Sequence, residues 1–334
     1  MSPSQDEEEA PVPAPAPEPA TTQPSPAEAR YDAATANPEL DVAKLKSLPA
    51  EQHELYILTF VSSLSKHVLA LPADDCTSQQ LYLKKEIFQI INLASPAPSR
   101  VIRHDLGQCL AHVLGKGDRK LLFETINDLV GIISGGKSKT DSDVRAKHAA
   151  IHCLGDVFAS AGDSAIGLHQ LSCTALLKLL RSSSGNAGLR AAALTALSKI
   201  VGMIGGSLDE VIGRDMWKQG RNHTTDKGAL VVVAACRCLK ALVKRTPYFR
   251  SSGDFDKLET AILKAFDSSI TQVRHAAADC FAEALVQGHS ESGEPPAKGK
   301  KSKAKLKRAS THPGIEADED VIGSPRSSSP APGG

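Results

Sequence analysis

Apolar residues recur at spacings of three and four along most of the chain between residues 47 and 288. The clearest case is Glu51–Leu71, where they stand at 55, 57, 58, 60, 61, 64, 68 and 71, as on one face of a helix. Pro49 supplies a residue that favours a helix start. Nothing in this region alternates with period two over the length of a strand, apart from the short run Leu230–Val233. The pattern therefore predicts an all-α core.

Eleven helices are expected between the polar, Gly-rich or Pro-containing breaks. Their expected ranges are Glu51–Leu71, Thr77–Leu93, Ser99–Lys116, Asp118–Ile133, Asp141–Ala161 (with Asp141 or Ser142 as its cap), Ile166–Arg181, Asn186–Ile204, Ser207–Lys218, Asp226–Lys244, Ser251–Asp267 and Ile270–Gln287.

One pair of residues, a small residue followed by a large one, recurs through this pattern. The pairs are Cys109-Leu110, Cys153-Leu154, Ala196-Leu197, Cys238-Leu239 and Cys280-Phe281, and the large residues are 44, 43, 42 and 42 positions apart. A period of about 40–47 residues built from helix pairs is typical of HEAT and armadillo arrays. We therefore expect a HEAT/armadillo-like α-solenoid of about five helix pairs, wound as a right-handed superhelix. The pair at residues 51–93 is expected to form an irregular first unit.

The repeat also explains the cysteines. A small residue at the same point of every unit predicts a position where two helices approach closely, and Cys serves there as a small hydrophobe. Seven cysteines in a chain without an evident secretory signal indicate reduced thiols and a cytoplasmic protein. The longest apolar run, Ala229–Cys236, is eight residues, which is too short to span a membrane.

Composition divides the chain into three parts. Residues 1–46 hold nine of the 20 prolines and nine acidic against three basic residues. Residues 289–334 are Lys-rich and then acidic and Ser/Pro-rich. Both have the composition of disordered segments, so the expected domains are a tail at 1–46, a solenoid at 47–288 and a tail at 289–334. The solenoid carries 28 basic and 23 acidic residues, an excess too small and too spread to indicate nucleic acid or anionic lipid.

An aliphatic residue followed by Arg opens several units. Ile102-Arg103, Leu189-Arg190 and Val273-Arg274 stand eight and seven residues before the large residue of the repeat. HEAT repeats commonly place such a dipeptide near the start of the second helix of a unit. We expect these arginines to bridge to acidic or carbonyl groups of the adjacent unit.

The segment Gly131–Ser138 fits the phosphate-binding pattern G-x-x-x-x-G-K-[ST]. That loop needs a buried strand before it and a helix directly after it. Here a helical segment precedes it and a polar stretch follows, and the repeat places it in a link between units. The structural interpretation is favoured, with a nucleotide-binding enzyme that uses Lys137 as the alternative.

Two further groups suggest chemistry less strongly. His148 and His152 are four apart on one helix face and could share a metal ion, but no third and fourth ligands stand at short fixed spacing. The cluster from Lys298 to Arg308 could be a nuclear-import or electrostatic patch; a solvated linker is the favoured interpretation. No activated-nucleophile motif is found. We expect no catalytic, cofactor or metal site, and the partner-binding residues are unknown from sequence.

Four segments resemble the N-terminal region of the HEAT-repeat-containing protein five family. They are LPAEQHELYILTFVSSLSKHVLAL, SPAPSRVIRHDLGQCLAHVLGKGDRKLLFETINDLVGII, AKHAAIHCLGDVFASAG and CTALLKLLRSSSGNAGLRAAALTALSKIVGMIGG. The fungal members of this family are the large accessory protein of the trans-Golgi/endosomal clathrin adaptor. Family members are far longer, and the resemblance covers about residues 48–288.

The resemblance implies a non-enzymatic scaffold in vesicle-mediated transport. It would assist clathrin-adaptor recruitment, endosome-to-Golgi retrograde traffic and endocytosis. Its partners would be clathrin-adaptor components or their accessory proteins, and it would sit peripherally on Golgi and endosomal membranes through them, without nucleic acid. The alternative is another HEAT scaffold, of the nuclear-transport or phosphatase-scaffold type.

Overall fold

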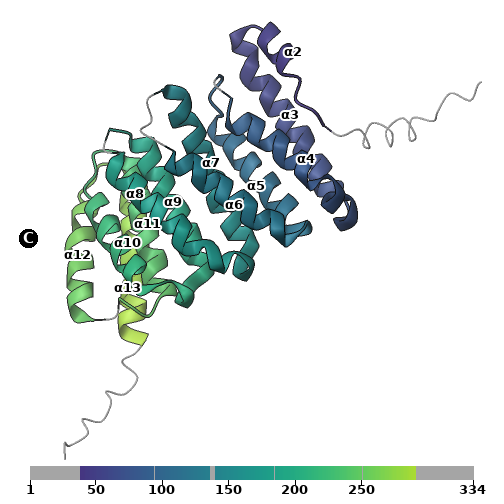
Figure 1. Cartoon of the computed structure of the whole chain (residues 1–334). Helices are drawn as coiled ribbons and strands as arrows, with labels where there is room; N and C mark the ends of the chain where they lie inside the picture. Colours follow the sequence, from purple (N-terminus) through teal and green to yellow (C-terminus); the bar gives the residue numbers. More distant parts are fainter. Residues whose placement is uncertain (1–37, 94, 136–139, 184, 250, 291–334) are drawn as a thin grey trace, which may run out of the picture. The chain divides into compact units, whose positions relative to one another are not determined.

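The computed structural model describes residues 38–290, with gaps at 94, 136–139, 184 and 250. Within these residues the elements are helices and there is no strand (Figure 1). In chain order they are α2 (Val42–Ser47), α3 (Ala50–Ala70), α4 (Ala73–Ile91), α5 (Arg100–Lys116), α6 (Arg119–Ser134), α7 (Asp141–Ala161), the 3-10 helix η1 (Gly162–Leu168), α8 (His169–Ser182), α9 (Ala187–Ile204), η2 (Gly205–Ser207), α10 (Glu210–His223), α11 (Ala229–Arg245), α12 (Ser252–Phe266) and α13 (Thr271–Ser290).

The helices form two layers. The first layer holds α4, α6, α8, α10 and α12, and each of these packs against the helix that follows it in the chain. The second layer holds α5, α7, α9, α11 and α13, in which each helix packs extensively against the next, and α3 precedes α5 in it. The described part therefore contains five helix pairs, α4–α5, α6–α7, α8–α9, α10–α11 and α12–α13. We call the members of a pair its first helix and its second helix.

The expected number of pairs is confirmed, but the expected first pair is wrong. Residues 51–93 were expected to pair with each other, whereas α4 packs as the first helix of α5. The repeat marks only the second helices, and α3 is the second-layer helix that comes before the first complete pair. The small–large dipeptide lies on every second helix from α5 to α13.

Small residues allow the second helices to approach closely. Gly155 on α7 faces α9, where a Cβ added to it would lie 3.2 Å from the Cα of Ala196. Ala196 is the small member of its own repeat pair and is buried. Because an added Cβ would crowd the backbone of α9 at that distance, the two helices can approach this closely only when small residues stand at the crossing. The recurring small position therefore determines how tightly successive units stack.

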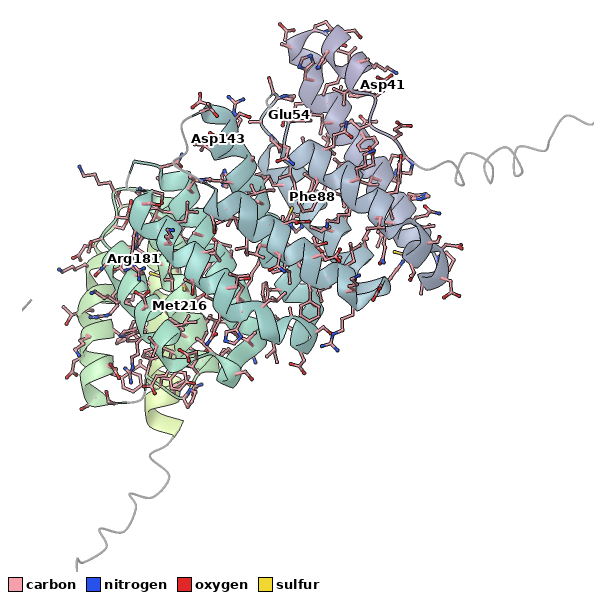
Figure 2. The ribbon with its side chains drawn as sticks, viewed as in Figure 1. Asp41, Glu54, Phe88, Asp143, Arg181 and Met216 are labelled. Atoms are coloured by element: carbon pink, nitrogen blue, oxygen red, sulfur yellow. The ribbon has the colours of Figure 1, made fainter. Side chains whose placement is uncertain are left out.

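Side chains between the layers form one continuous apolar core. Ion pairs on the surface join neighbouring units, as between Lys84 on α4 and Asp128 on α6, at 2.6 Å. Arg181 on α8 pairs in the same way with Asp215 on α10. Figure 2 labels Arg181 and Met216, the residue that follows Asp215 in the chain. Each unit thus contacts its neighbours, which is how a solenoid is stabilised.

Capping residues read from the sequence largely mark the true helix starts. Ser99, Asp118, Asn186 and Ser251 each cap the expected helix through a side-chain oxygen that accepts a backbone N–H, which satisfies a donor left free by the first turn. At α7 the cap is Thr140, which forms a capping box with Asp143.

Other boundaries differ from expectation. The helix expected from Ser207 begins at Glu210, because Asp209 accepts N–H groups from residues 211 and 212, and it extends to His223. Residues 166–168 lie in the 3-10 helix η1. The expected tail boundary at residue 46 is also wrong, since α2 begins at Val42. Leu40 and Leu45 are buried there, and the Leu40 N–H donates to Glu86 at 2.9 Å. Residues 1–37 and 291–334 lie outside the described residues, so their expected disorder stays a prediction.

One stretch, Ala187–Ser207, has the length and mean hydropathy of a membrane-spanning helix. It contains α9, which packs between α7 and α11 in the second layer. Half of that stretch is buried inside the protein. Its apolar composition is accounted for by this central position, because a helix covered on both sides needs apolar residues around most of its circumference.

Candidate partner-binding surface

The recurring cysteines occupy the core positions expected of them. Cys109, Cys153, Cys238 and Cys280 are at most 1 % exposed, and all seven cysteines are buried free thiols. Burial raises the pKa of the Cys238 thiol to about 12 and that of Cys109 to about 11. A thiol that resists ionisation is a poor nucleophile and metal ligand. These residues are packing groups.

The aliphatic–Arg dipeptides lie near the start of second helices, as expected. Arg103 and Arg274 each donate to a carbonyl of the link before their own helix, Pro98 at 2.5 Å and Ser268 at 2.7 Å. The expected bridge to the adjacent unit is wrong for these two. It is correct for Arg190, which donates to Ser183 in its own unit and forms a half-buried ion pair of 2.9 Å with Asp226 in the next.

The phosphate-loop match begins inside a helix. Gly131 lies within α6, which ends at Ser134 and is followed by Gly135 as its C-cap, so the segment before the loop is not a strand. Residues 136–139, with Lys137 and Ser138, lie outside the described residues. The link connects α6 and α7, which form one pair, and the expected placement between units is therefore wrong. The repeat period alone did not distinguish links within pairs from links between them.

His148 and His152 do lie together on α7, with ring centroids 5.2 Å apart and tilted by 47°. No group of three or more His, Cys, Asp or Glu residues suited to a metal ion occurs among the residues that the structure describes. The surroundings of the two rings are cationic instead. Burial and then Arg103 lower the pKa of His148 to about 4.

The pKa of His152 is lowered to about 3. Burial is the main cause, and the charges of nearby groups lower the pKa further; these groups are His148, Arg103, Lys199 and Arg100. These groups come from α5, α7 and α9, three successive second helices. We call Arg100, Arg103, His148, His152 and Lys199 the basic cluster.

The charge of the folded part is not evenly spread over the two layers. The second helices α5, α7, α9 and α11 carry eleven Lys and Arg residues against four Asp. The first helices α4 to α12 carry eleven against ten acidic residues. The expected spread of the excess is therefore wrong in one respect: both sets carry the same number of basic residues, but the central second helices carry fewer acidic ones. A sequence count cannot show this until the helices are assigned to layers.

Exposed apolar residues accompany these charges. Val101 on α5 and Leu230 on α11 stand nine residues before the large residue of their repeats, and they are 56 % and 67 % exposed. At the equivalent position of α9 stands Gly188. The surface of the second helices thus offers both cationic and apolar contacts, which together are typical of protein-binding faces.

Sequence reasoning missed the link between Asp156 and Lys199, and with it the basic cluster. Both residues stand two positions after the large residue of their repeats, on α7 and α9. They form an ion pair in which Asp156 is 3 % exposed and Lys199 33 %. The repeat register could have suggested that this position faces the next unit. It could not show which pairs of units would carry opposite charges.

This architecture is an all-α solenoid of the HEAT/armadillo-like class, a class of repeat scaffold that binds proteins through long exposed helical faces. No family model matches the chain. It is 25% identical over 251 residues to Protein SWEETIE of Arabidopsis thaliana, across 73% of this chain and 11% of that protein. The chain therefore spans about a ninth of the length of this relative.

Solved structures of repeat proteins are similar to the chain. An engineered protein has 15% identity and a TM-score of 0.44, covering 75% of this chain and 98% of the other. A designed armadillo repeat protein in complex with the peptide (KR)4 has 13% identity and a TM-score of 0.44 over 73% and 97%. The archaeal HEAT-like repeats protein of Thermococcus onnurineus NA1 has 16% identity and a TM-score of 0.38 over 67% and 80%.

Proposed function

We propose that this chain is a non-enzymatic HEAT-repeat scaffold in vesicle-mediated protein transport. It assists the recruitment of a clathrin adaptor and takes part in endosome-to-Golgi retrograde traffic and endocytosis. The observation that carries the proposal is the resemblance of residues 48–288 to the HEAT-repeat-containing protein five family, in four segments that follow one another in order. The repeat-scaffold architecture is compatible with such a role.

The second-layer surface supports action by binding. It combines a positive surplus with exposed apolar side chains, and α5 to α13 lie side by side along it. A surface of this kind can hold an extended partner over several units. The proposed partners are clathrin-adaptor components or their accessory proteins, and they would bring the cytoplasmic chain to Golgi and endosomal membranes.

Co-purification of the tagged full-length product from cells, together with imaging, tests the proposal. Adaptor components should be recovered, and the tag should mark Golgi or endosomal puncta. Diffuse cytosol without adaptor association would contradict it. Nuclear accumulation that depends on residues 298–308 would favour the nuclear-transport alternative, and nucleotide binding lost in Lys137→Ala would favour the enzyme.

Matched variants connect the result to the surface. The double variant Val101→Glu/Leu230→Glu changes exposed apolar residues of second helices and should lower adaptor recovery. The control Leu81→Glu/Leu171→Glu makes the same kind of change at exposed positions of the first helices α4 and α8, and recovery should be retained. Equal recovery in both would show that the second-layer surface is not the binding face.

A further inference from the structure

The basic cluster contains cationic groups that lack a matching negative charge. Arg103 donates to the Pro98 carbonyl, and its Nε–H is buried with no hydrogen-bond partner. Within the described residues, no carboxylate lies within ion-pair distance of Arg100 or Arg103. A half-buried guanidinium with an unused N–H costs free energy unless another group satisfies it. Burial and then Arg100 lower the pKa of the Arg103 side chain.

The two histidines lie near enough to this guanidinium for its charge to lower their pKa values. His148 also lies close to the start of α9. If Gly188 carried a Cβ atom, that atom would lie 3.6 Å from the His148 Cε1. Asp156, the acidic residue on the same stretch of α7, is already engaged by Lys199. The pair of rings is half-buried, so a ligand must reach below the outermost side chains to contact it.

The neighbouring positions of α9 carry short side chains. The half-buried residues there are Ala191 and Thr195, at the repeat positions that His148 and His152 occupy on α7. On α11 the position of Thr195 is taken by Arg237, which is exposed. Short side chains on α9 therefore stand between the histidine positions of α7 and Arg237 on α11.

We propose that the basic cluster binds an acidic peptide segment of a protein partner, whose carboxylates supply the missing negative charge. Adjacent packed helices lie about 8–10 Å apart, and an extended peptide rises about 3.3 Å per residue. Acidic residues spaced about two to three apart can therefore meet α5, α7 and α9 in turn. A carboxylate on a flexible side chain can reach the half-buried Arg103 and histidines, whereas the phosphates of a flat bilayer or a rigid duplex stay at the rim.

The inference deepens the proposed function by naming the chemistry of the partner segment, and it rests on that proposal only in requiring a protein partner. Purified full-length chain and a fluorescein-labelled peptide of repeated Glu-Ser units test it by anisotropy. Binding should weaken with salt, because surface charges are screened, and the corresponding Lys-Ser peptide should not bind. This assay needs no adaptor, so its failure is separable from failure of the co-purification experiment.

Arg100→Glu is the decisive variant, since Arg100 is exposed and its replacement leaves the core intact. We expect its affinity for the Glu-Ser peptide to fall about tenfold or more. The control Arg119→Glu makes the same charge change at an exposed position of α6 in the first layer and should change affinity less than about twofold. Equal losses in both variants, or no binding by the unaltered chain, would overturn the proposal.

Two further arms locate the peptide and exclude other ligands. In NMR titrations of the histidine side chains, the peptide should raise the pKa of His148 or His152, because a nearby carboxylate stabilises the imidazolium; unmoved histidines would place the peptide elsewhere and overturn the site. If phosphatidylserine vesicles bind in an Arg100-dependent way and the peptide does not, the ligand is a membrane surface and the proposal fails.

Discussion

Asp156 on α7 forms an ion pair with Lys199 on α9, 43 positions later in the chain. Its second carboxylate oxygen is buried without a hydrogen-bond partner and faces Gly107 on α5, where any Cβ would overlap with it. One side chain therefore contacts three successive second helices. It joins units that are otherwise held mainly by apolar packing.

Lys199→Met should destabilise the protein by roughly 3 kcal/mol, because it leaves a buried carboxylate without its cation. The figure is at the lower end for a buried pair, since water reaches part of Lys199. Lys240→Met is the control: its partner Asp279 is 71% exposed, and the loss should be under about 1 kcal/mol. Urea denaturation measures both, and equal losses would show that Asp156 is solvated in solution.

Gly107→Ala should also destabilise the protein, by about 1–3 kcal/mol, because the added methyl group displaces the Asp156 carboxylate. Gly115→Ala on the same helix has no atom within 4 Å of the new Cβ, and it should be neutral or stabilising by up to about 1 kcal/mol. If the two variants are equally stable in thermal or chemical denaturation, the close approach of α5 and α7 is incorrect.

Single Cys→Ala changes at the repeat positions should cost about 1 kcal/mol, since Ala already serves at 196. Cys238→Arg should unfold its unit, because an unpaired buried charge costs several kcal/mol. Thiol-reactive dyes should label Cys173 and Cys238 only after denaturant is added, since burial raises the pKa of each to about 12. Fast labelling in native buffer would contradict the core assignment.

Stability should fall as the pH is lowered from about 6.5 toward 4. Burial and the neighbouring cations hold the folded pKa values of His148 and His152 near 4 and 3, below the ordinary histidine value of 6.5. The unfolded chain therefore binds protons first, and each histidine contributes at most about 1.4 kcal/mol per pH unit. Above pH 6.5 this contribution to stability is fully present.

The double variant His148→Asn/His152→Asn isolates this effect from that of the carboxylates. Its stability should fall less steeply than that of the unaltered chain when urea denaturation is repeated between pH 7 and pH 4.5. His104→Asn, at an exposed histidine of α5, is the matched control substitution. Parallel profiles for the unaltered chain and the double variant would show that the two rings are protonated alike in both states.

Most of the fold could be predicted because its signals are local. The period of 42–44 residues, the caps at Ser99 and Asn186, and the small residues before Leu were sufficient to indicate helix pairs and core cysteines. What failed was pairing. The repeat period identifies the second helix of each unit but does not show which neighbouring helix pairs with it. For this reason the sequence pattern wrongly pairs α4 with α3 and wrongly places the α6–α7 link between two units.

The candidate surface could not be predicted for a related reason. His148 and His152 are recognisable as one helix face, but Arg103 and Lys199 are 45 positions before and 51 positions after the first of them. Only stacking brings these charges together, and the same two histidines suggested a metal site when considered alone. Long-range juxtaposition, rather than local propensity, determines their chemistry.

Gly155 and Ala196 have a consequence for the reach of the molecule. Where two helices pack this closely, the residues at the crossing set the angle between them. One added methyl group would tilt α9 relative to α7, and the units that follow α9 would move with it as a rigid body. Groups on α11 and α13 would then shift against those on α5 although none of them had changed. Substitutions at these crossings can thus change the distance between binding groups on early and late helices, and with it the spacing that a partner must match.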